Sequence, residues 1–125
     1  MEKRKILLVD DDVNLTELLK ITLEKTGKYE VRVQNSGSRG LESAKLFKPD
    51  LIVLDFSMPD MDGSEVAQMI LDDEEVKRTP LVFLTSIVTD EDVQSGRGLI
   101  GGIRFIAKLQ SLKKLIASIE ENIPT

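Results

Sequence analysis

The distribution of apolar residues along the chain predicts five β-strands. Four short runs are almost continuously apolar, as expected for strands covered on both faces: Ile6–Val9, Leu51–Leu54, Leu81–Leu84 and Arg104–Ala107. The segment Tyr29–Gln34 instead alternates apolar with polar residues, which is typical of a strand with one face in water. The two patterns indicate that a sheet buries these strands to different depths.

Between the predicted strands, apolar residues recur with the spacing of an α-helix. Asn14 and Glu17 resemble a capping box at the start of the first helix, and Gly27 is expected to end that helix. Further helices are predicted from apolar residues three and four positions apart: Ser38–Phe47, Ser64–Leu71 and the stretch from Leu112 to Ile119. Strands that alternate with helices predict an α/β domain with a parallel sheet and helices on both faces.

The strand patterns also predict the order of the strands. The first, third and fourth strands are the most apolar and belong in the middle, whereas the alternating second strand and the arginine-bearing fifth strand suit the edges. With right-handed crossovers this gives a flavodoxin-like, doubly wound, five-stranded parallel sheet of order 2-1-3-4-5. Such a sheet has its binding crevice at the carboxyl ends of the first and third strands.

Length and composition narrow the possible chemistry. The 125 residues correspond to a single domain spanning 1–125. The absence of cysteine and histidine excludes thiolate nucleophiles, imidazole bases and metal sites built from either residue. The formal charge of −5 argues against direct nucleic-acid binding. Because the apolar run near the amino terminus is too short for a signal peptide or membrane span, we expect a cytoplasmic protein without membrane contact.

Charged residues stand at the predicted carboxyl ends of the strands. Asp10 and Asp11 follow the first strand, Asp55 follows the third, Thr85 closes the fourth and Lys108 follows the fifth. Carboxylates that converge from two adjacent strands repel one another, so such a cluster recruits a cation or holds a proton. Without histidine or cysteine, oxygen ligands favour a hard ion, and we expect Mg²⁺ as the cofactor.

This arrangement resembles the receiver domain of two-component response regulators, over essentially the whole chain. The acidic pair of that family is matched by Asp10 and Asp11. Its phosphoacceptor aspartate is matched by Asp55, which is followed by Met58-Pro59 and Asp62-Gly63 as in the family motif. The resemblance therefore implies a single-domain receiver that accepts a phosphoryl group.

The resemblance also implies a role for each matched residue. Asp55 is the expected nucleophile and phosphoacceptor. Lys108 would neutralise a phosphoryl oxygen, Thr85 would hydrogen-bond another, and Phe105 takes the position of the aromatic switch residue. The expected ligands of Mg²⁺ are the side chains of Asp11 and Asp55, the main-chain carbonyl of Ser57, and Asp10 through a water molecule.

The same resemblance implies partners. Because the chain has no histidine, the phosphoryl group must come from outside, from a sensor histidine kinase, a phosphotransfer protein or a small acyl phosphate. A downstream protein is expected to bind the face formed by residues 90–121, since no output domain is expected within 1–125. The protein would be a signalling switch that catalyses its own phosphorylation and dephosphorylation rather than a conventional enzyme.

Other interpretations of these residues remain open. Asp10–Asp12 alone would more often cap a helix than bind a metal ion. An aspartyl-phosphate phosphohydrolase would need a second aspartate two residues after the nucleophile, where Ser57 stands. A flavin-binding module would need a phosphate loop after the first strand, where three aspartates would repel phosphate. A scaffold receiver that is never phosphorylated is the remaining alternative.

The sequence departs from the receiver pattern in two places. Leu109 replaces the proline that usually follows the conserved lysine, so we expect a trans peptide after Lys108 and a shifted loop. Four of the eight glycines fall within Gly96–Gly102, so we expect at most a short helix over Asp90–Ser95 and a mobile segment after it. Apolar Ile87 beside the site predicts slow self-dephosphorylation, because it cannot orient an attacking water.

Overall fold

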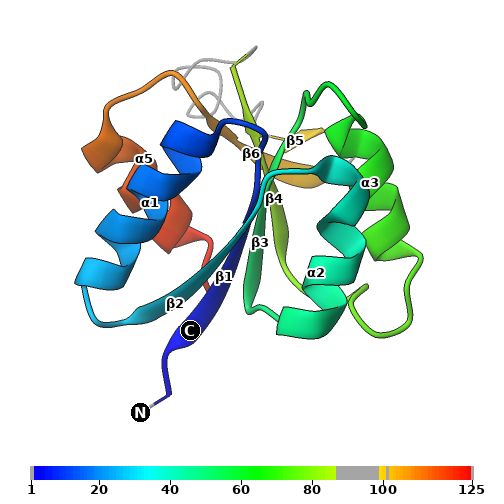
Figure 1. The fold of residues 1–125 in the computed structure, drawn as a ribbon, viewed down its shortest axis with the longest axis horizontal. Coiled ribbons are helices and arrows are strands. Elements are labelled where there is room, and N and C mark those ends of the chain that lie inside the picture. Colours follow the sequence, from blue (N-terminus) through cyan, green and yellow to red (C-terminus); the bar gives the residue numbers. More distant parts are fainter. Residues whose placement is uncertain (1, 87–98, 101, 125) are drawn as a thin grey trace.

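A computed structural model describes residues 2–86, 99–100 and 102–124, and in it the strands form one twisted sheet (Figure 1). The sheet order is β2-β1-β3-β4-β6-β5. The bounds of the strands are β1 Arg4–Val9, β2 Tyr29–Gln34, β3 Leu51–Asp55, β4 Leu81–Thr85, β5 Leu99–Ile100 and β6 Ile103–Ala107.

The five strands predicted from the apolar pattern are all present, parallel and in the predicted order. Val9 lies beside Leu54, Asp55 beside Leu84, and Thr85 beside Ala107, so the carboxyl ends of these strands reach the same edge. The sequence did not predict β5, which pairs antiparallel with the start of β6. The first two residues of the arginine-bearing strand β6 therefore pair with β5, and β5 rather than β6 is the outermost strand.

Helices cover both faces of the sheet, α1 and α5 on one and α2 and α3 on the other (Figure 1). The helix bounds are α1 Val13–Lys25, the 3-10 helix η1 Gly37–Arg39, α2 Gly40–Phe47, α3 Gly63–Leu71 and α5 Leu112–Glu121. Consecutive residues of β1 point to opposite faces: Ile6 and Leu8 pack toward α1 and α5, and Leu7 and Val9 toward α2 and α3. Side chains on both faces of β1 are buried, which explains the unbroken apolar run.

The start of the first helix corrects the sequence prediction. The N-cap is Asp12 rather than Asn14, and the Leu15 N–H donates to Asp12 Oδ1 at 3.0 Å. An aspartate in extended conformation satisfies an orphan amide of the first turn as well as asparagine does, and α1 begins at Val13 directly after it. Gly27, with a φ of 78°, follows the helix end as predicted.

The segment rich in glycine is described only in part. Residues 87–98 and 101 lie outside the described residues, and so do the predicted short helix Asp90–Ser95, Ile87 and most of Gly96–Gly102. Gly102 has a φ of 83°, a backbone conformation that favours glycine.

Within the described part of the chain, no helix combines the length and apolar character that a membrane span requires.

Candidate functional site

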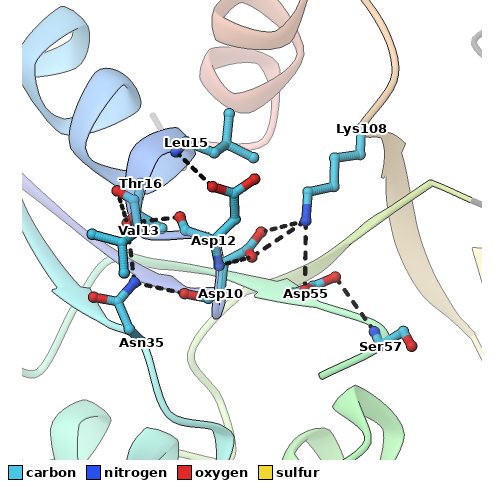
Figure 2. Close-up of polar contacts among 9 residues, drawn as sticks. All are labelled: Asp10, Asp12, Val13, Leu15, Thr16, Asn35, Asp55, Ser57 and Lys108. Atoms are coloured by element: carbon cyan, nitrogen blue, oxygen red, sulfur yellow. Dashed lines mark hydrogen bonds and ion pairs between the residues drawn. The ribbon is translucent and has the colours of Figure 1, made fainter. Parts of the chain in front are cut away.

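Three charged side chains, those of Asp10, Asp55 and Lys108, meet at the carboxyl edge of the sheet (Figure 2), where Thr85 ends the neighbouring strand. Asp10 directly follows β1, Asp55 ends β3, Thr85 ends β4, and Lys108 directly follows β6. The parallel register aligns these strand ends, so residues from four distant parts of the sequence become neighbours. The convergence predicted from the strand pattern is therefore present.

Asp10, Asp11 and Asp55 form an acidic cluster. Each offers a carboxylate oxygen, and these oxygens lie within 4.8 Å of one another. Asp10 and Asp55 are buried, at 2% and 4% exposure, whereas Asp11 is exposed. Asp10 Oδ2 is buried and has no hydrogen-bond donor among the described residues. Three carboxylates so close together, two of them buried, suit a hard divalent cation.

Lys108 provides a positive charge next to the acidic cluster. Its Nζ donates to Asp10 Oδ1 at 3.2 Å and lies 3.0 Å from Asp10 Oδ2, where the geometry makes an ion pair but no hydrogen bond. Asp55 Oδ2 lies 3.5 Å from the same ammonium. The described residues contain no cis peptide, so the expected trans bond between Lys108 and Leu109 is confirmed. Leu109 in place of proline does not keep the lysine from the cluster.

Burial and the neighbouring charges shift the pKa values of Asp55 and Lys108. Burial, followed by repulsion from Asp10, raises the pKa of Asp55 from its ordinary 3.8 to about 7, even though Lys108 and the Ser57 N–H act in the opposite direction. Burial by itself would lower the pKa of Lys108, but the nearby Asp10 and Asp55 carboxylates raise it above its ordinary value. Lys108 therefore stays charged at neutral pH, while Asp55 is poised to exchange a proton for another cation.

The raised pKa of Asp55 predicts how stability depends on pH without metal. A carboxyl whose pKa is higher in the folded protein favours folding fully below about pH 3.8, and this contribution is lost as the pH rises through about 7. Asp55→Asn removes the buried charge. We expect this variant to be about 2 kcal/mol more stable than wild type at pH 8, with a smaller difference at pH 5.

Urea unfolding in the presence of a metal chelator measures this difference. The exposed carboxylate of Asp72 provides a matched control, because Asp72→Asn removes one charge at a solvated helix end and should give no such gain. No histidine titrates between pH 5 and 8 to mask the effect. An Asp55→Asn protein no more stable than wild type at pH 8 would show that Asp55 carries no charge penalty.

The turn that carries Asp10 and Asp11 is held by its own hydrogen bonds. The Asp12 N–H donates to Asp10 Oδ1 at 2.9 Å, and the Thr16 N–H and hydroxyl both donate to the Asp12 carbonyl. Asp12 also caps α1, so one acidic run caps the helix and builds the cluster (Figure 2). The capping and metal-site interpretations of Asp10–Asp12 therefore apply to different residues.

The chain after Asp55 is held close to the site by backbone contacts. The Ser57 N–H donates to Asp55 Oδ1 at 3.4 Å, and the Phe56 N–H donates to the Leu84 carbonyl at 3.0 Å. The Gly63 N–H donates to the Phe56 carbonyl at 2.8 Å, which places the start of α3 against this segment. A Cβ on Gly63 would overlap the Asp55 carbonyl oxygen, so only glycine fits there.

Two further predicted residues are buried in β4 and β6, the strands that lead to Thr85 and Lys108. Thr85 is buried, at 2% exposure, and Phe105 is buried in β6, at 5%. Phe105 lies opposite Phe83 in the sheet register and belongs to the apolar cluster under α2 and α3. The inward position of the aromatic ring is therefore the one present in this structure.

Sequence reasoning missed Asn35 and Asp60. The Asn35 amide donates to the main-chain carbonyl of Asp10 at 2.7 Å (Figure 2), and the Asp60 carboxylate accepts from the loop that follows Asn35. Nothing in the spacing of these two residues signals their role, because each acts across a gap between loops. Their identity as asparagine and aspartate, residues that often bind loop backbone, was the available signal.

Comparison with known proteins places this site in a family. A profile described as the response regulator receiver domain matches residues 6–120. The chain belongs to the response regulator receiver family. It is 40% identical over 119 residues, 95% of this chain, to the nisin biosynthesis regulatory protein NisR of Lactococcus lactis. It is 34% identical over 118 residues, 94% of this chain, to the alkaline phosphatase synthesis transcriptional regulatory protein PhoP of Bacillus subtilis.

Solved receiver structures share the fold. The chemotaxis protein CheY4 of Vibrio cholerae superposes with a TM-score of 0.80 at 27% identity, covering 98% of this chain and all of CheY4. The receiver domain of HemR from Leptospira biflexa superposes with a TM-score of 0.78 at 35% identity, covering 98% and 96% of the two chains. The predicted receiver fold of two-component signalling is therefore confirmed.

The curated relatives are longer than this receiver. The chain spans about half the length of NisR and PhoP, at 50% and 47% of each. Other relatives carry the name DNA-binding response regulator MtrA, at 32% identity. The expectations that this protein has no output domain and contacts no nucleic acid stay predictions.

Proposed function

We propose that this receiver accepts a phosphoryl group on Asp55 from the phosphohistidine of a histidine kinase or phosphotransfer protein, in a reaction that needs Mg²⁺. The observation that carries the proposal is the position of Asp55, which is buried beside Asp10 and Asp11 and within 3.5 Å of the Lys108 ammonium that also pairs with Asp10. A nucleophile that lies next to both anionic metal ligands and a lysine ammonium suits phosphoryl transfer. Receiver domains interact with histidine kinases, which makes such a kinase the natural donor.

The proposed phosphoryl transfer is an in-line displacement at phosphorus. An Asp55 carboxylate oxygen forms a bond to phosphorus while the bond from phosphorus to the donor nitrogen breaks, and the donor imidazole keeps the electron pair and takes up a proton. Asp55 must be deprotonated to attack, so its raised pKa makes loss of the proton part of activation. The product is an acyl phosphate on Asp55.

The acidic cluster fits Mg²⁺, which would supply positive charge to the phosphoryl oxygens. Its proposed ligands are the side chains of Asp11 and Asp55, the Ser57 main-chain carbonyl, and Asp10 through a water molecule. The close approach of the Asp10, Asp11 and Asp55 carboxylates, two of which are buried, supports this assignment. Octahedral Mg²⁺ keeps several waters and takes few carboxylates, which matches so small a cluster.

Lys108, Thr85 and Phe105 would respond to the negative charge of the phosphoryl group on Asp55. Lys108 would move from its ion pairs with Asp10 and Asp55 to a phosphoryl oxygen, and Thr85 would hydrogen-bond a second one. Thr85 lies directly beside Ala107 in the sheet register, two residues after Phe105, so a shift of Thr85 reaches the strand that holds the aromatic ring. We propose that this coupling changes the partner-binding face formed by residues 90–121, part of which lies outside the described residues.

Intact-mass measurement after incubation with acetyl phosphate tests the proposal. We expect wild-type protein to gain the mass of one phosphoryl group in the presence of Mg²⁺ and none with chelator, whereas Asp55→Asn gains none in either case. Asp72→Asn, which removes an exposed carboxylate at the end of α3, should be phosphorylated like wild type. Wild-type protein that stays unmodified with a fresh donor, or an Asp55→Asn protein that is modified as fully, would overturn the assignment.

A further inference from the structure

The loop between β2 and α2 touches both acidic loops of the site. We call the segment Asn35–Ser38 the bridging loop. Its first residue binds the turn that carries Asp10 and Asp11, and its next three bind Asp60 in the loop that follows Asp55. Four consecutive residues therefore connect the two chain segments that supply the proposed metal ligands.

The first contact fixes the turn after β1 from outside. The Asn35 Nδ2 donates to the Asp10 main-chain carbonyl at 2.7 Å and to the Thr16 hydroxyl at 3.1 Å (Figure 2). Thr16 is buried, at 1% exposure, and its hydroxyl in turn donates to the Asp12 carbonyl. One side chain thus joins the end of β2 to both the strand end and the first turn of α1.

The second contact fixes the loop after β3. The Asp60 carboxylate accepts from the Ser36 hydroxyl at 2.9 Å, from the Gly37 N–H at 3.2 Å and from the Ser38 N–H at 3.1 Å. Three donors on one carboxylate favour its charged form, and these hydrogen bonds lower the pKa of Asp60 to about 2. Asp60 is therefore held as an anion throughout the physiological range.

Packing keeps the two loops in direct contact. Met58, three residues after Asp55, is buried at 6% exposure, and its Cε would lie 2.9 Å from a Cβ placed on Gly37. The Met61 carbonyl oxygen would lie 3.2 Å from the same Cβ. The loop that contains Ser57 thus rests against the bridging loop without space between them.

We propose that the bridging loop holds the two ligand-bearing loops in the geometry that Mg²⁺ requires, with Asn35 and Asp60 as its positioning residues. This inference rests on the proposed function, since it concerns the same metal site. The clustered carboxylates of Asp10, Asp11 and Asp55 repel one another, so their loops must be held together before a cation arrives. Groups that orient metal ligands from behind contribute strongly to affinity in other metalloproteins.

Direct titration with Mg²⁺ tests the proposal without any phosphoryl donor. By isothermal calorimetry we expect Asn35→Ala and Asp60→Ala each to weaken Mg²⁺ binding about tenfold. The double variant should weaken binding by less than the product of the single effects, because the bridge is already open after either change. With acetyl phosphate, each variant should need about tenfold more Mg²⁺ for half-maximal phosphorylation but reach nearly the wild-type rate at saturation.

Two matched controls separate positioning from general stability. Asn122 donates its amide to the Ser118 carbonyl at 2.8 Å, the same kind of bond that Asn35 makes, but at the end of α5. Asp73 accepts from the Glu75 N–H at 2.9 Å and pairs with Lys45, away from the site. We expect Asn122→Ala and Asp73→Ala to lower the melting temperature without changing the affinity for Mg²⁺.

The possible outcomes decide between the two proposals. If Asn35→Ala and Asp60→Ala bind Mg²⁺ as tightly as wild type, the bridging loop only stabilises the fold and this inference is wrong. Suppose instead that wild-type protein binds Mg²⁺, that both variants bind it more weakly, and that wild-type protein is never phosphorylated. The inference about the bridging loop then holds, and the proposed phosphoryl transfer is wrong. Wild-type protein that binds no Mg²⁺ would overturn both.

Discussion

Replacing Lys108 by methionine should slow phosphorylation of Asp55 by acetyl phosphate about a hundredfold. Lys108 Nζ lies 3.0 Å from Asp10 Oδ2 and 3.5 Å from Asp55 Oδ2, and it is the fixed cation placed to meet the incoming phosphoryl oxygens. Removing one preorganised charge of this kind costs about 10²–10³ in rate. The loss also raises the pKa of Asp55 further, because Lys108 now lowers it, so less of the nucleophile is ionised at neutral pH.

The rate of mass gain at saturating Mg²⁺, followed by quenched intact-mass analysis, measures this effect. Lys45→Met is the matched control, since Lys45 pairs with Asp73 at 3.3 Å outside the site and should leave the rate unchanged. Lys108→Arg keeps the charge but not the compact ammonium, and we expect an intermediate rate. Phosphorylation of Lys108→Met at the wild-type rate would show that Mg²⁺ alone stabilises the transferred group.

Replacing Gly63 by alanine should destabilise the protein by about 3 kcal/mol and displace the site. The added Cβ would overlap the Asp55 carbonyl oxygen and lie 2.7 Å from Phe56 Cα, both of which are backbone atoms. Rotation of a side chain cannot relieve such a contact, so the start of α3 must move away. The hydrogen bond from the Gly63 N–H to the Phe56 carbonyl, 2.8 Å long, would lengthen with it.

Urea unfolding and phosphorylation together test this prediction, with Gly27→Ala as the matched control. Gly27 has a φ of 78°, and a Cβ added there would have nothing within 4 Å, so alanine meets only backbone strain of about 1 kcal/mol. Gly27→Ala should be phosphorylated normally, whereas Gly63→Ala should lose both stability and phosphorylation. Equal stability losses in the two variants would mean that α3 does not press on the backbone of Asp55.

The fold followed from the sequence because burial leaves a direct signal in the hydrophobic pattern. Leu51–Leu54 is covered on both faces and is continuously apolar, whereas Tyr29–Gln34 borders the sheet and alternates. Asp10, Asp55 and Lys108 could be placed together because a parallel sheet aligns the residues that follow its strands. Topology, rather than any local feature, brought these side chains into one prediction.

What the sequence did not reveal depends on contacts between loops or on choices between equivalent residues. Asp12 and Asn14 can both cap a helix, and the backbone conformation decided for Asp12. The two-residue strand β5 is too short to leave a period in the sequence. Asn35 and Asp60 act across space on chain segments far away in sequence, so no spacing rule points to them.

The most direct test of the account locates the phosphoryl group itself. An acyl phosphate on an aspartate is reduced by borohydride to homoserine, which peptide mass spectrometry then identifies at a single position. After treatment with acetyl phosphate and Mg²⁺, we expect homoserine at residue 55 and no reduction product, homoserine from aspartate or 5-hydroxynorvaline from glutamate, at any other position. Homoserine at Asp10, Asp11 or a residue outside the acidic cluster, with Asp55 unchanged, would contradict the central claim.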